Sequence, residues 1–230
     1  MLRRVLSAAC VAGFVSGLLL SALQQWQVVP LLRAAEVYET EHDHAASAER
    51  AAVVETRAFD GWEAPATLAA ANVALGVGFA LILAGVSSLR RSEGWRAGAL
   101  WGLAGYIVFF VAPSLGLPPT LPGVPIAPLG PRTAWWLFAV GCSAGGLWLI
   151  VFARPVPLRA LGIALLLVPH AIGAPRLDAP SSLVPAELSR GFVRATYLCN
   201  AVFWVLIGTL VGVGLAFSRT PPRAEAERRG

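Results

Sequence analysis

Apolar stretches of about 20 residues recur along nearly the whole chain of 230 residues, and they limit the fold more than any other feature. Only 13% of the residues are charged, whereas about a quarter would be charged in a soluble globular protein. A stretch of this length is what a helix needs to cross a hydrocarbon core about 30 Å thick. We therefore predict an all-α fold, a polytopic bundle of transmembrane helices in a lipid bilayer.

Six segments reach this length, and their positions predict about six membrane spans. The fifth segment is the weakest, because it is close to the minimum length and carries Pro169 and His170 at its end. A bundle of five spans is the alternative. The six segments run from about Val5 to Leu23, Thr67 to Val86, Ala97 to Leu115, Thr133 to Phe152, Pro157 to Gly173 and Ala195 to Phe217.

Arginine supplies all 18 basic residues, and its distribution predicts the orientation of the chain in the membrane. With a cytoplasmic N-terminus, six spans place 11 of these arginines inside and 10 of the 13 acidic residues outside. Cytoplasmic loops of membrane proteins carry such an excess of basic residues. We therefore expect a multi-pass protein of the cell inner (cytoplasmic) membrane with both termini in the cytoplasm. Five spans would move the Arg-rich C-terminal tail to the outside.

The chain is predicted to form a single integral membrane domain over residues 1–230. The first span also resembles a secretory signal peptide, because two arginines precede its apolar run. That run is longer than a usual signal core and no clean Ala-x-Ala cleavage site follows it, which favours an uncleaved helix. Outside the spans we expect an acidic outer loop at 24–66, a Pro-rich outer loop at 116–132 and a cytoplasmic Arg-rich tail at 218–230.

Pairs of glycines four residues apart occur in four of the predicted spans and support a compact bundle. Helices in lipid associate through small residues that let their backbones approach, because lipid already surrounds their apolar side chains. The pairs are Gly13 and Gly17, Gly98 and Gly102, Gly141 and Gly145, and Gly208 and Gly212.

Several enzyme classes are disfavoured by what the sequence lacks. Without lysine there is no G-x-x-x-x-G-K-[ST] phosphate-binding loop and no lysine Schiff base. Three histidines are too few for a histidine-rich di-iron site, and neither G-x-S-x-G nor H-E-x-x-H occurs. We therefore expect no enzymatic activity and no permanently bound cofactor. The net charge of +5 describes a basic inner membrane surface, and no basic module for nucleic acid is evident.

A cluster of acidic residues and histidines follows the first span, on the predicted outer side. The sequence EHDH at residues 41–44 contains two of the three histidines. Imidazole and carboxylate groups suit divalent cobalt, nickel or zinc, whereas Cu(I) favours sulfur ligands. A helical backbone would place Glu36, Glu39 and Asp43 on one face, and an extended backbone would align the two histidines. The alternative is a solvated acidic loop. The candidate ligands are Glu36, Glu39, Glu41, His42, Asp43 and His44.

Three polar side chains lie within the predicted spans or at their ends, where such groups are costly unless they have a partner or a function. His170 stands at the outer end of the fifth span, after Pro169, and the sequence Gly173-Ala174-Pro175 allows the helix to break. Backbone carbonyls freed there could line a polar cavity, so His170 is a further candidate ligand. Asn72 and Asn200 lie in the second and sixth spans, as interhelical hydrogen-bond partners or as part of an ion path.

Six segments, in order along the chain, resemble the CbtA family of cobalt transporter subunits. They are VPLLRAAEVYE, EHDH, GVGFALIL, GWRAGALWGLAGYIVFFVAPSLGLPPTLPG, LVPHAIGAP and VPAELSRGFVRATYLCNAVFWVLIG. The resemblance implies an integral membrane protein of five to six spans that takes part in cobalamin-related cobalt uptake. It also implies a partner, a small one-span CbtB-type subunit with a histidine-rich end.

The residues and the resemblance together predict a membrane subunit of a divalent metal uptake transporter. The transported ion would be Co2+, with Ni2+ or Zn2+ as alternatives. The outer loop with EHDH would capture the ion, and His170 with Asn72 or Asn200 would pass it through the helical bundle. A homo-oligomer is a further option for the assembly. The alternative function is a non-transporting assembly or sensor subunit that docks a metal-binding partner.

Overall fold

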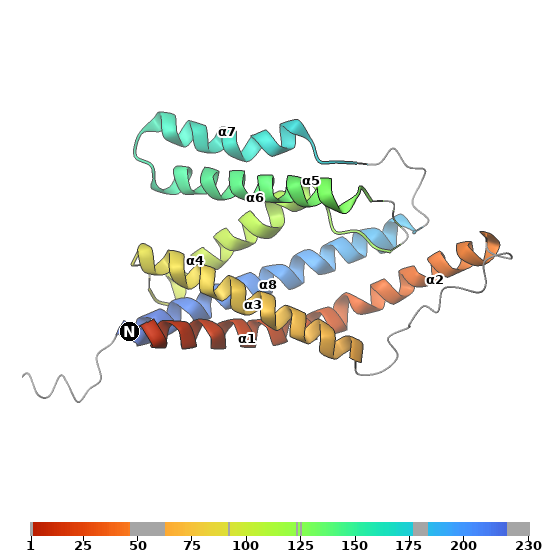
Figure 1. Ribbon diagram of the computed structural model, residues 1–230, viewed down its shortest axis with the longest axis horizontal. Helices are drawn as coiled ribbons and strands as arrows, with labels where there is room; N and C mark the ends of the chain where they lie inside the picture. The colour runs from red at the N-terminus through yellow and green to blue at the C-terminus, as the bar shows by residue number, and fades with distance from the viewer. Residues whose placement is uncertain are drawn as a thin grey trace, which may run out of the picture. The chain divides into compact units, whose positions relative to one another are not determined.

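The chain is helical throughout most of the residues that the computed structural model describes, which are 2–46, 63–91, 93–122, 124, 126–176 and 184–219 (Figure 1). The predicted all-α class is thereby confirmed. The elements in chain order are α1 (Leu2–Gln27), α2 (Val29–Ala46), α3 (Glu63–Leu89), α4 (Trp95–Tyr106), the π-helix η1 (Ile107–Val111), α5 (Ala112–Gly116), α6 (Leu129–Phe152), α7 (Val156–Ile172) and α8 (Ala186–Arg219).

Among the described residues, five helical segments are long and apolar enough to cross a membrane, so the chain is a multi-pass membrane protein. The shortest of them has 22 residues, which at 1.5 Å per residue gives about 33 Å and matches a hydrocarbon core about 30 Å thick. α7 has 17 residues and reaches only about 26 Å, so the segment that the sequence marks as weakest is also the shortest. The five segments are Leu2–Gln27, Glu63–Leu89, Trp95–Gly116, Leu129–Phe152 and Ala186–Ser218.

The chain divides into two compact units. The first unit is formed by α1, α3, α4 and the C-terminal part of α8. The second is formed by α2, η1, α5, α6, α7 and the N-terminal part of α8. Of the described residues, the first holds 2–23, 63–91, 93–106 and 199–219, and the second holds 24–46, 107–122, 124, 126–176 and 184–198.

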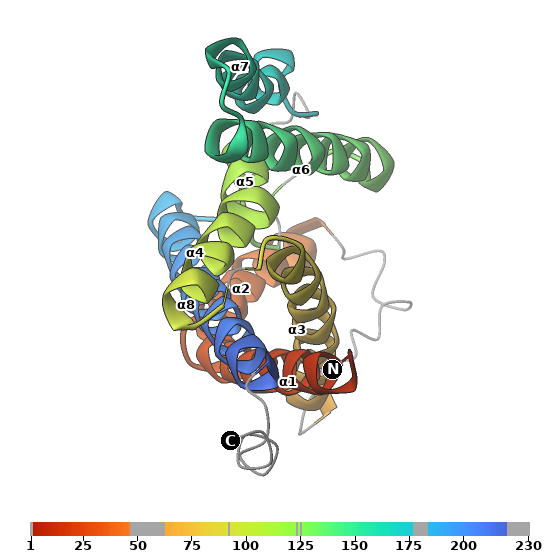
Figure 2. The same ribbon diagram turned by 90° about the vertical axis from the view of Figure 1, so that its left-hand side faces the viewer.

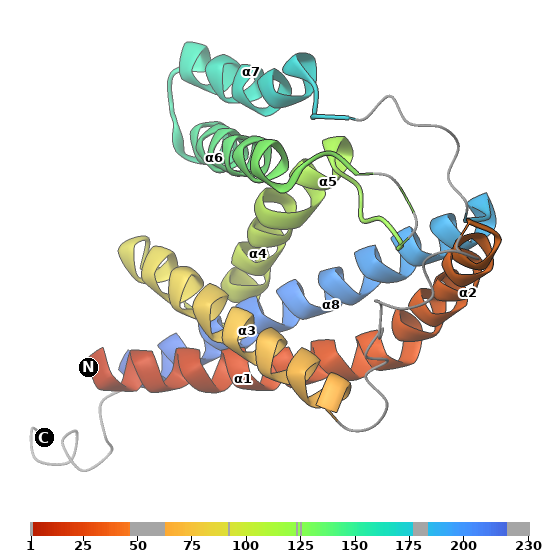
Figure 3. The same cartoon turned by 45° about the vertical axis from the view of Figure 1, so that its right-hand side comes forward.

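Glycines hold the helices of the first unit in close contact. A Cβ atom added to Gly13 of α1 would lie 2.5 Å from the Cα atom of Val77 in α3, which is too close for any side chain. A Cβ atom on Gly98 or Gly102 of α4 would likewise collide with the backbone of α8. Figure 3 shows α3 crossing α1 and α4 meeting α8. Small residues at such crossings let the two backbones touch, which is how helices associate in lipid.

An aromatic core fills the space beside these glycine contacts. Trp204 of α8 is 2% exposed, and its ring centroid lies 4.6 Å from that of Phe79 in α3. A Cβ atom on Gly105 of α4 would strike the Trp204 ring. Three helices of the first unit therefore meet around one indole.

The turn between α3 and α4 is attached to α8 by a backbone hydrogen bond. The amide of Gly94 donates to the carbonyl oxygen of Gly212 at 2.9 Å. Gly94 has a φ of +88°, a conformation that costs glycine little and other residues much more. Glycine is therefore required at position 94 for the turn. The approach to α8 requires glycine at position 212 instead, because a Cβ atom there would collide with the carbonyl oxygen of Gly94.

A buried polar contact joins α1 to α3. Asn72 Nδ2 donates to Ser21 Oγ at 3.1 Å, and Ser21 Oγ donates to the carbonyl oxygen of Gly17 at 2.9 Å. Both side chains are 6% exposed. In a lipid-surrounded bundle this chain of hydrogen bonds gives each donor an acceptor that the hydrocarbon cannot supply.

The second unit contains an antiparallel hairpin of α6 and α7, which lie side by side in Figures 1 and 2. The connection is short, and Arg159 Nε donates to the carbonyl oxygen of Ala153 at 2.8 Å beyond the end of α6. The hairpin closes where Gly146 meets Gly162: a Cβ atom on either would lie within 2.7 Å of the other's carbonyl oxygen. A Cβ atom on Gly141 would meet nothing within 4 Å, and one on Gly145 would be in ordinary contact with Leu165 of α7 at 3.8 Å, so the closest approach of this helix is at Gly146.

Gly102→Ala should lower the free energy of unfolding by about 1–3 kcal/mol, because the added methyl group pushes α4 away from α8. Gly141→Ala is the matched control: it has open space and should be neutral or stabilising by up to about 1 kcal/mol through helix propensity. Denaturant titration of the purified protein in detergent measures both. Equal stability of the two variants would contradict the close contact of α4 with α8.

Reporter fusions can decide whether α7 crosses the membrane. If it does, a fusion after Arg176 should show alkaline phosphatase activity and a fusion at the C-terminus should show cytoplasmic fluorescence, as the arginine distribution predicts. A fusion after Arg154, between α6 and α7, should be cytoplasmic with either five or six spans and serves as the control. Cytoplasmic signals after Arg176 would leave α7 on the inner side and move the C-terminus outside.

Candidate functional site

α2 carries the acidic cluster and begins shortly after α1 ends, with Val28 between them. The helical bonding almost continues through this point, because Val28 donates to the carbonyl of Gln24 at 2.8 Å and Leu32 donates to that of Val28 at 3.1 Å. Pro30 lies in the first turn of α2 and has no N–H, so the bond that an unbroken helix would make there is missing. Proline at this position therefore separates α1 from α2 without ending the helical course of the chain.

One face of α2 packs on the N-terminal part of α8 within the second unit. Val28 and Ala35 are buried, and the Leu31 side chain would be in van der Waals contact with a Cβ atom on Gly191 of α8. These positions recur at spacings of three and four, so they form one apolar face. Arg33 and Glu36 are exposed. The segment predicted as an outer loop thus contains an amphipathic helix.

The EHDH sequence lies within the backbone of α2, so the helical one of the two predicted geometries applies to it. The described side chains of the cluster end with Glu36 and Tyr38, and those of EHDH lie outside the described residues, as does that of Glu39. Among the residues described, no group of three or more histidines, cysteines, aspartates or glutamates is placed to hold a metal ion. The ligand set on α2 therefore stays a prediction.

His170 lies in the last turn of α7, half-buried against the ring of Trp135 from α6. The ring centroids are 6.1 Å apart in an edge-to-face arrangement. The helix ends two residues later, at Ile172: Gly173 has a φ of +87° and donates its N–H to the carbonyl of Pro169 at 3.0 Å. The predicted break after the histidine is present, and it directs the chain away from the helix at this point.

Trp135 belongs to a tightly packed cluster around this histidine. The indole is 7% exposed, and its Nε1 atom has no hydrogen-bond partner among the described residues. A Cβ atom on Gly116 at the end of α5 would collide with the Trp135 ring and lie 3.1 Å from Cβ of Ala174. Three segments of the second unit therefore converge beside His170. The imidazole of His170 is chemically able to ligate a cation through a neutral ring nitrogen, whereas the indole N–H of Trp135 is a donor only.

The third membrane segment contains a π-helix that its sequence does not predict. η1 lies between α4 and α5, and Pro113 in the first turn of α5 cannot donate a hydrogen bond to the carbonyl four residues back. The ring of Phe110 in η1 lies 5.0 Å from that of Tyr197 in α8, edge to face. Short π-helices are frequent at functional sites. A proline inside an apolar span was the available sequence signal.

The candidate residues divide between the two units. α2 and His170 belong to the second unit, whereas Asn72 and Asn200 belong to the first. Asn72 is engaged with Ser21 in the contact between α1 and α3. Asn200 is half-buried on α8 and also has an interaction partner. The hydrogen bond of Asn72 supports its role in helix packing.

Comparison with known proteins adds one finding to this geometry. The family model described as "Probable cobalt transporter subunit (CbtA)" matches residues 2–216, from the first residue of α1 nearly to the end of α8. No curated protein and no solved structure matches the chain. The family match covers all five span-length helices, and the resemblance noted in the sequence is confirmed. The chain belongs to the CbtA family of cobalt transporter subunits.

Proposed function

We propose that the chain is a membrane subunit for uptake of divalent cobalt, in which the acidic segment on α2 captures the ion outside and the helical bundle passes it inward. The observation that carries this proposal is the CbtA match over residues 2–216, which takes in every helix of the bundle. The proposed role is transport in the cell inner membrane, and no chemical reaction is assigned to the chain.

Capture on α2 is supported by its composition and its position. The helix follows the first span directly, presents the exposed carboxylate of Glu36 and continues through EHDH. Carboxylates raise the local concentration of divalent cations, and imidazole nitrogen suits Co2+, with Ni2+ and Zn2+ as competitors. A transport site must bind strongly enough to load and weakly enough to release. The proposed capture ligands are Glu36, Glu39, Glu41, His42, Asp43 and His44.

His170 is the proposed second ligand for the transported ion, after those on α2. It belongs to the same compact unit as α2, and it stands where α7 ends and the backbone turns away beside the buried Trp135. A titratable group at the end of an apolar helix is retained for a partner or a function. In this proposal the ion moves from α2 to His170, and Asn72 or Asn200 assists its passage inward.

Assembly with a second polypeptide is part of the proposal. A family of transporter subunits implies a complex, and a small one-span histidine-rich subunit of the CbtB type is the proposed partner. Its histidines would supplement the few that this chain supplies. A homo-oligomer of the chain itself is compatible with the same role.

Substitution of the three histidines tests the proposal directly. Cells that lack their own cobalt transporter and express the chain with the small subunit should take up radioactive cobalt in a saturable manner, with nickel and zinc as competitors. His42→Gln with His44→Gln should raise the half-saturating concentration, because capture is weakened, and His170→Gln should lower the maximal rate. The triple variant should lose at least about tenfold in uptake, a loss typical of damaged metal sites.

The control for this experiment is Glu63→Gln, which removes an exposed carboxylate at the start of α3 and outside α2. It should leave uptake close to that of the unmodified chain, normalised to the protein present in the membrane. Uptake that survives the triple substitution would sink the proposal. Loss of both uptake and association with the small subunit would indicate instead that the histidines dock a partner.

A double-mutant cycle with Ser21 can separate a role of Asn72 in helix packing from a role in ion transport. Asn72→Ala and Ser21→Ala should each lower stability, and the double variant should lose less than the sum, with a coupling of about 0.6–1.7 kcal/mol as for hydrogen bonds between membrane helices. Uptake per folded molecule should stay unchanged if the amide serves packing alone. A fall in uptake without loss of stability would place Asn72 on the ion path.

A further inference from the structure

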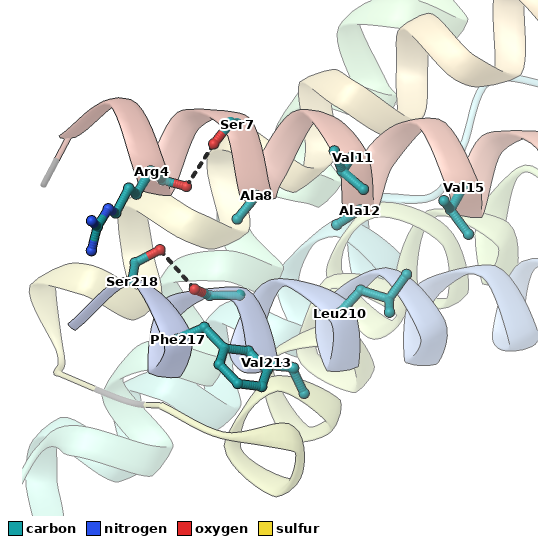
Figure 4. A pocket seen from close by; sticks show the side chains of 11 residues that line it. Arg4, Ser7, Ala8, Val11, Ala12, Val15, Leu210, Val213, Phe217 and Ser218 are labelled. Atoms are coloured by element: carbon teal, nitrogen blue, oxygen red, sulfur yellow. Dashed lines mark hydrogen bonds between the residues drawn. The ribbon is translucent and has the colours of Figure 1, made fainter. Parts of the chain in front are cut away.

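An apolar groove runs along the first unit between the N-terminal half of α1 and the C-terminal end of α8 (Figure 4). Its volume is about 520 Å3, within the range of about 300–1,000 Å3 common for ligand clefts. In Figure 4 the two helices run in opposite directions, with Arg4 beside Ser218 at one end and Val15 beside Leu210 at the other. The lining residues recur at spacings of three and four on both helices, so the groove follows one face of each.

The groove has a single charged side chain among its lining residues, and it lies at the mouth. Arg4 is exposed in the first turn of α1, and no ion pair joins it to another of the described residues. The two hydroxyl groups nearby are already used within their own helices: Ser7 donates to the carbonyl of Arg4 at 3.1 Å and Ser218 to that of Gly214 at 2.7 Å. The ends of α1 and α8 carry partial charges of opposite sign, about +0.5 and −0.5, which offset each other. The guanidinium of Arg4 therefore gives the mouth of the groove a positive charge.

The length of the groove distinguishes a lipid chain from a helix of another protein. From Arg4 to Val15 the helix rises about 16 Å, which is close to half of a hydrocarbon core about 30 Å thick. The groove thus extends from the membrane surface to the middle of the bilayer and ends there. A partner's transmembrane helix spans the full thickness of the core and would extend well beyond the groove. An acyl chain attached to a headgroup has the length of one leaflet.

We propose that this groove binds one acyl chain of an anionic phospholipid, whose phosphate pairs with Arg4. The floor is formed where Ala8 of α1 approaches Gly214 of α8, and a Cβ atom on Gly214 would lie 2.7 Å from that of Ala8. Small residues there leave room for the chain. Val11, 62% exposed, and Phe217, 75% exposed, form the walls. Bound lipid of this kind would stabilise the contact between the first and last membrane helices.

Two adjacent arginines provide a matched pair of variants. Arg3 and Arg4 are both exposed on the first turn of α1, but only Arg4 lines the groove. The full chain is reconstituted in phosphatidylcholine vesicles with a trace of phosphatidylglycerol that carries a photoactivatable group on its acyl chain. Labelling should concentrate on Val11, Val15 and Phe217. Arg4→Gln should lower it about fivefold, the value of one basic residue at an anionic lipid surface, and Arg3→Gln should leave it near the unmodified level.

A second pair tests the acyl-chain site separately from the charge. Val11→Trp should fill the groove and block labelling by phosphatidylglycerol and by a matching phosphatidylcholine probe. Phe14→Trp changes an exposed α1 residue outside the groove and should not. Equal effects of Arg3→Gln and Arg4→Gln would show that the arginines attract anionic lipid to the surface in general and not to the groove. That result would overturn the proposal. Labelling spread evenly over all helices, or cross-linking of a photoreactive residue at Val11 to a second copy of the chain, would overturn it as well.

Discussion

The approach of α4 to α8 at Gly98, Gly102, Gly208 and Gly212 is the contact on which the first unit depends. Lipid is as apolar as a leucine side chain, so burying leucines gives membrane helices little reason to associate. Direct contact of two backbones does favour their association, because many atoms reach van der Waals distance and a carbonyl becomes available to a donor from the neighbouring helix. The amide of Gly94 uses the carbonyl of Gly212 in this way. Replacing the glycines would separate both the helices and the turn.

The second unit uses the same principle at Gly146 and Gly162 and adds aromatic packing around His170. In the proposed role His170 must keep its ring in a defined position, and the packing of that ring against Trp135 near the end of α7 limits its movement. In the proposed capture step the carboxylates of α2 would act differently, because charges at a protein surface attract cations over several ångströms without fixing a geometry. Loose capture followed by an ordered ligand is consistent with a transport protein that must also release its ion.

Much of the fold could be predicted from the sequence, because apolar length is a local property and the lipid bilayer requires it. Each predicted span lies mainly within helix, although α8 begins at Ala186, well before the predicted start. Its first turns are polar, and the pairing of Arg190 with Glu187 helps to keep them helical. The helix α2 is not among the predicted spans, because a helix with one apolar face and one charged face has no long apolar run. The position of Pro113 did not by itself predict η1.

The site was less predictable, since it depends on contacts between distant residues. Histidines and carboxylates identified the candidate chemistry at α2 and His170, but Trp135 lies in another helix, and nothing in its local sequence connects it with His170. The spacing of glycines along the sequence likewise does not show which of them contact another helix. Gly141 and Gly145 have the spacing of a contact pair, yet a Cβ atom on Gly141 would meet open space and the close contact with α7 is made by Gly146. A pattern along one helix identifies a face only when the neighbouring helix is known.

The length of α7 has a consequence for the membrane itself. If α7 crosses the membrane, its length of about 26 Å in a core of about 30 Å is a hydrophobic mismatch, which the bilayer accommodates by thinning around the helix at a cost of fractions of a kcal/mol per Å. Thinning brings the headgroups and water closer to the end of α7, where His170 lies. In that case the electrostatic barrier for a charge that crosses beside α7 would be lower, and a bilayer of longer lipids would raise it.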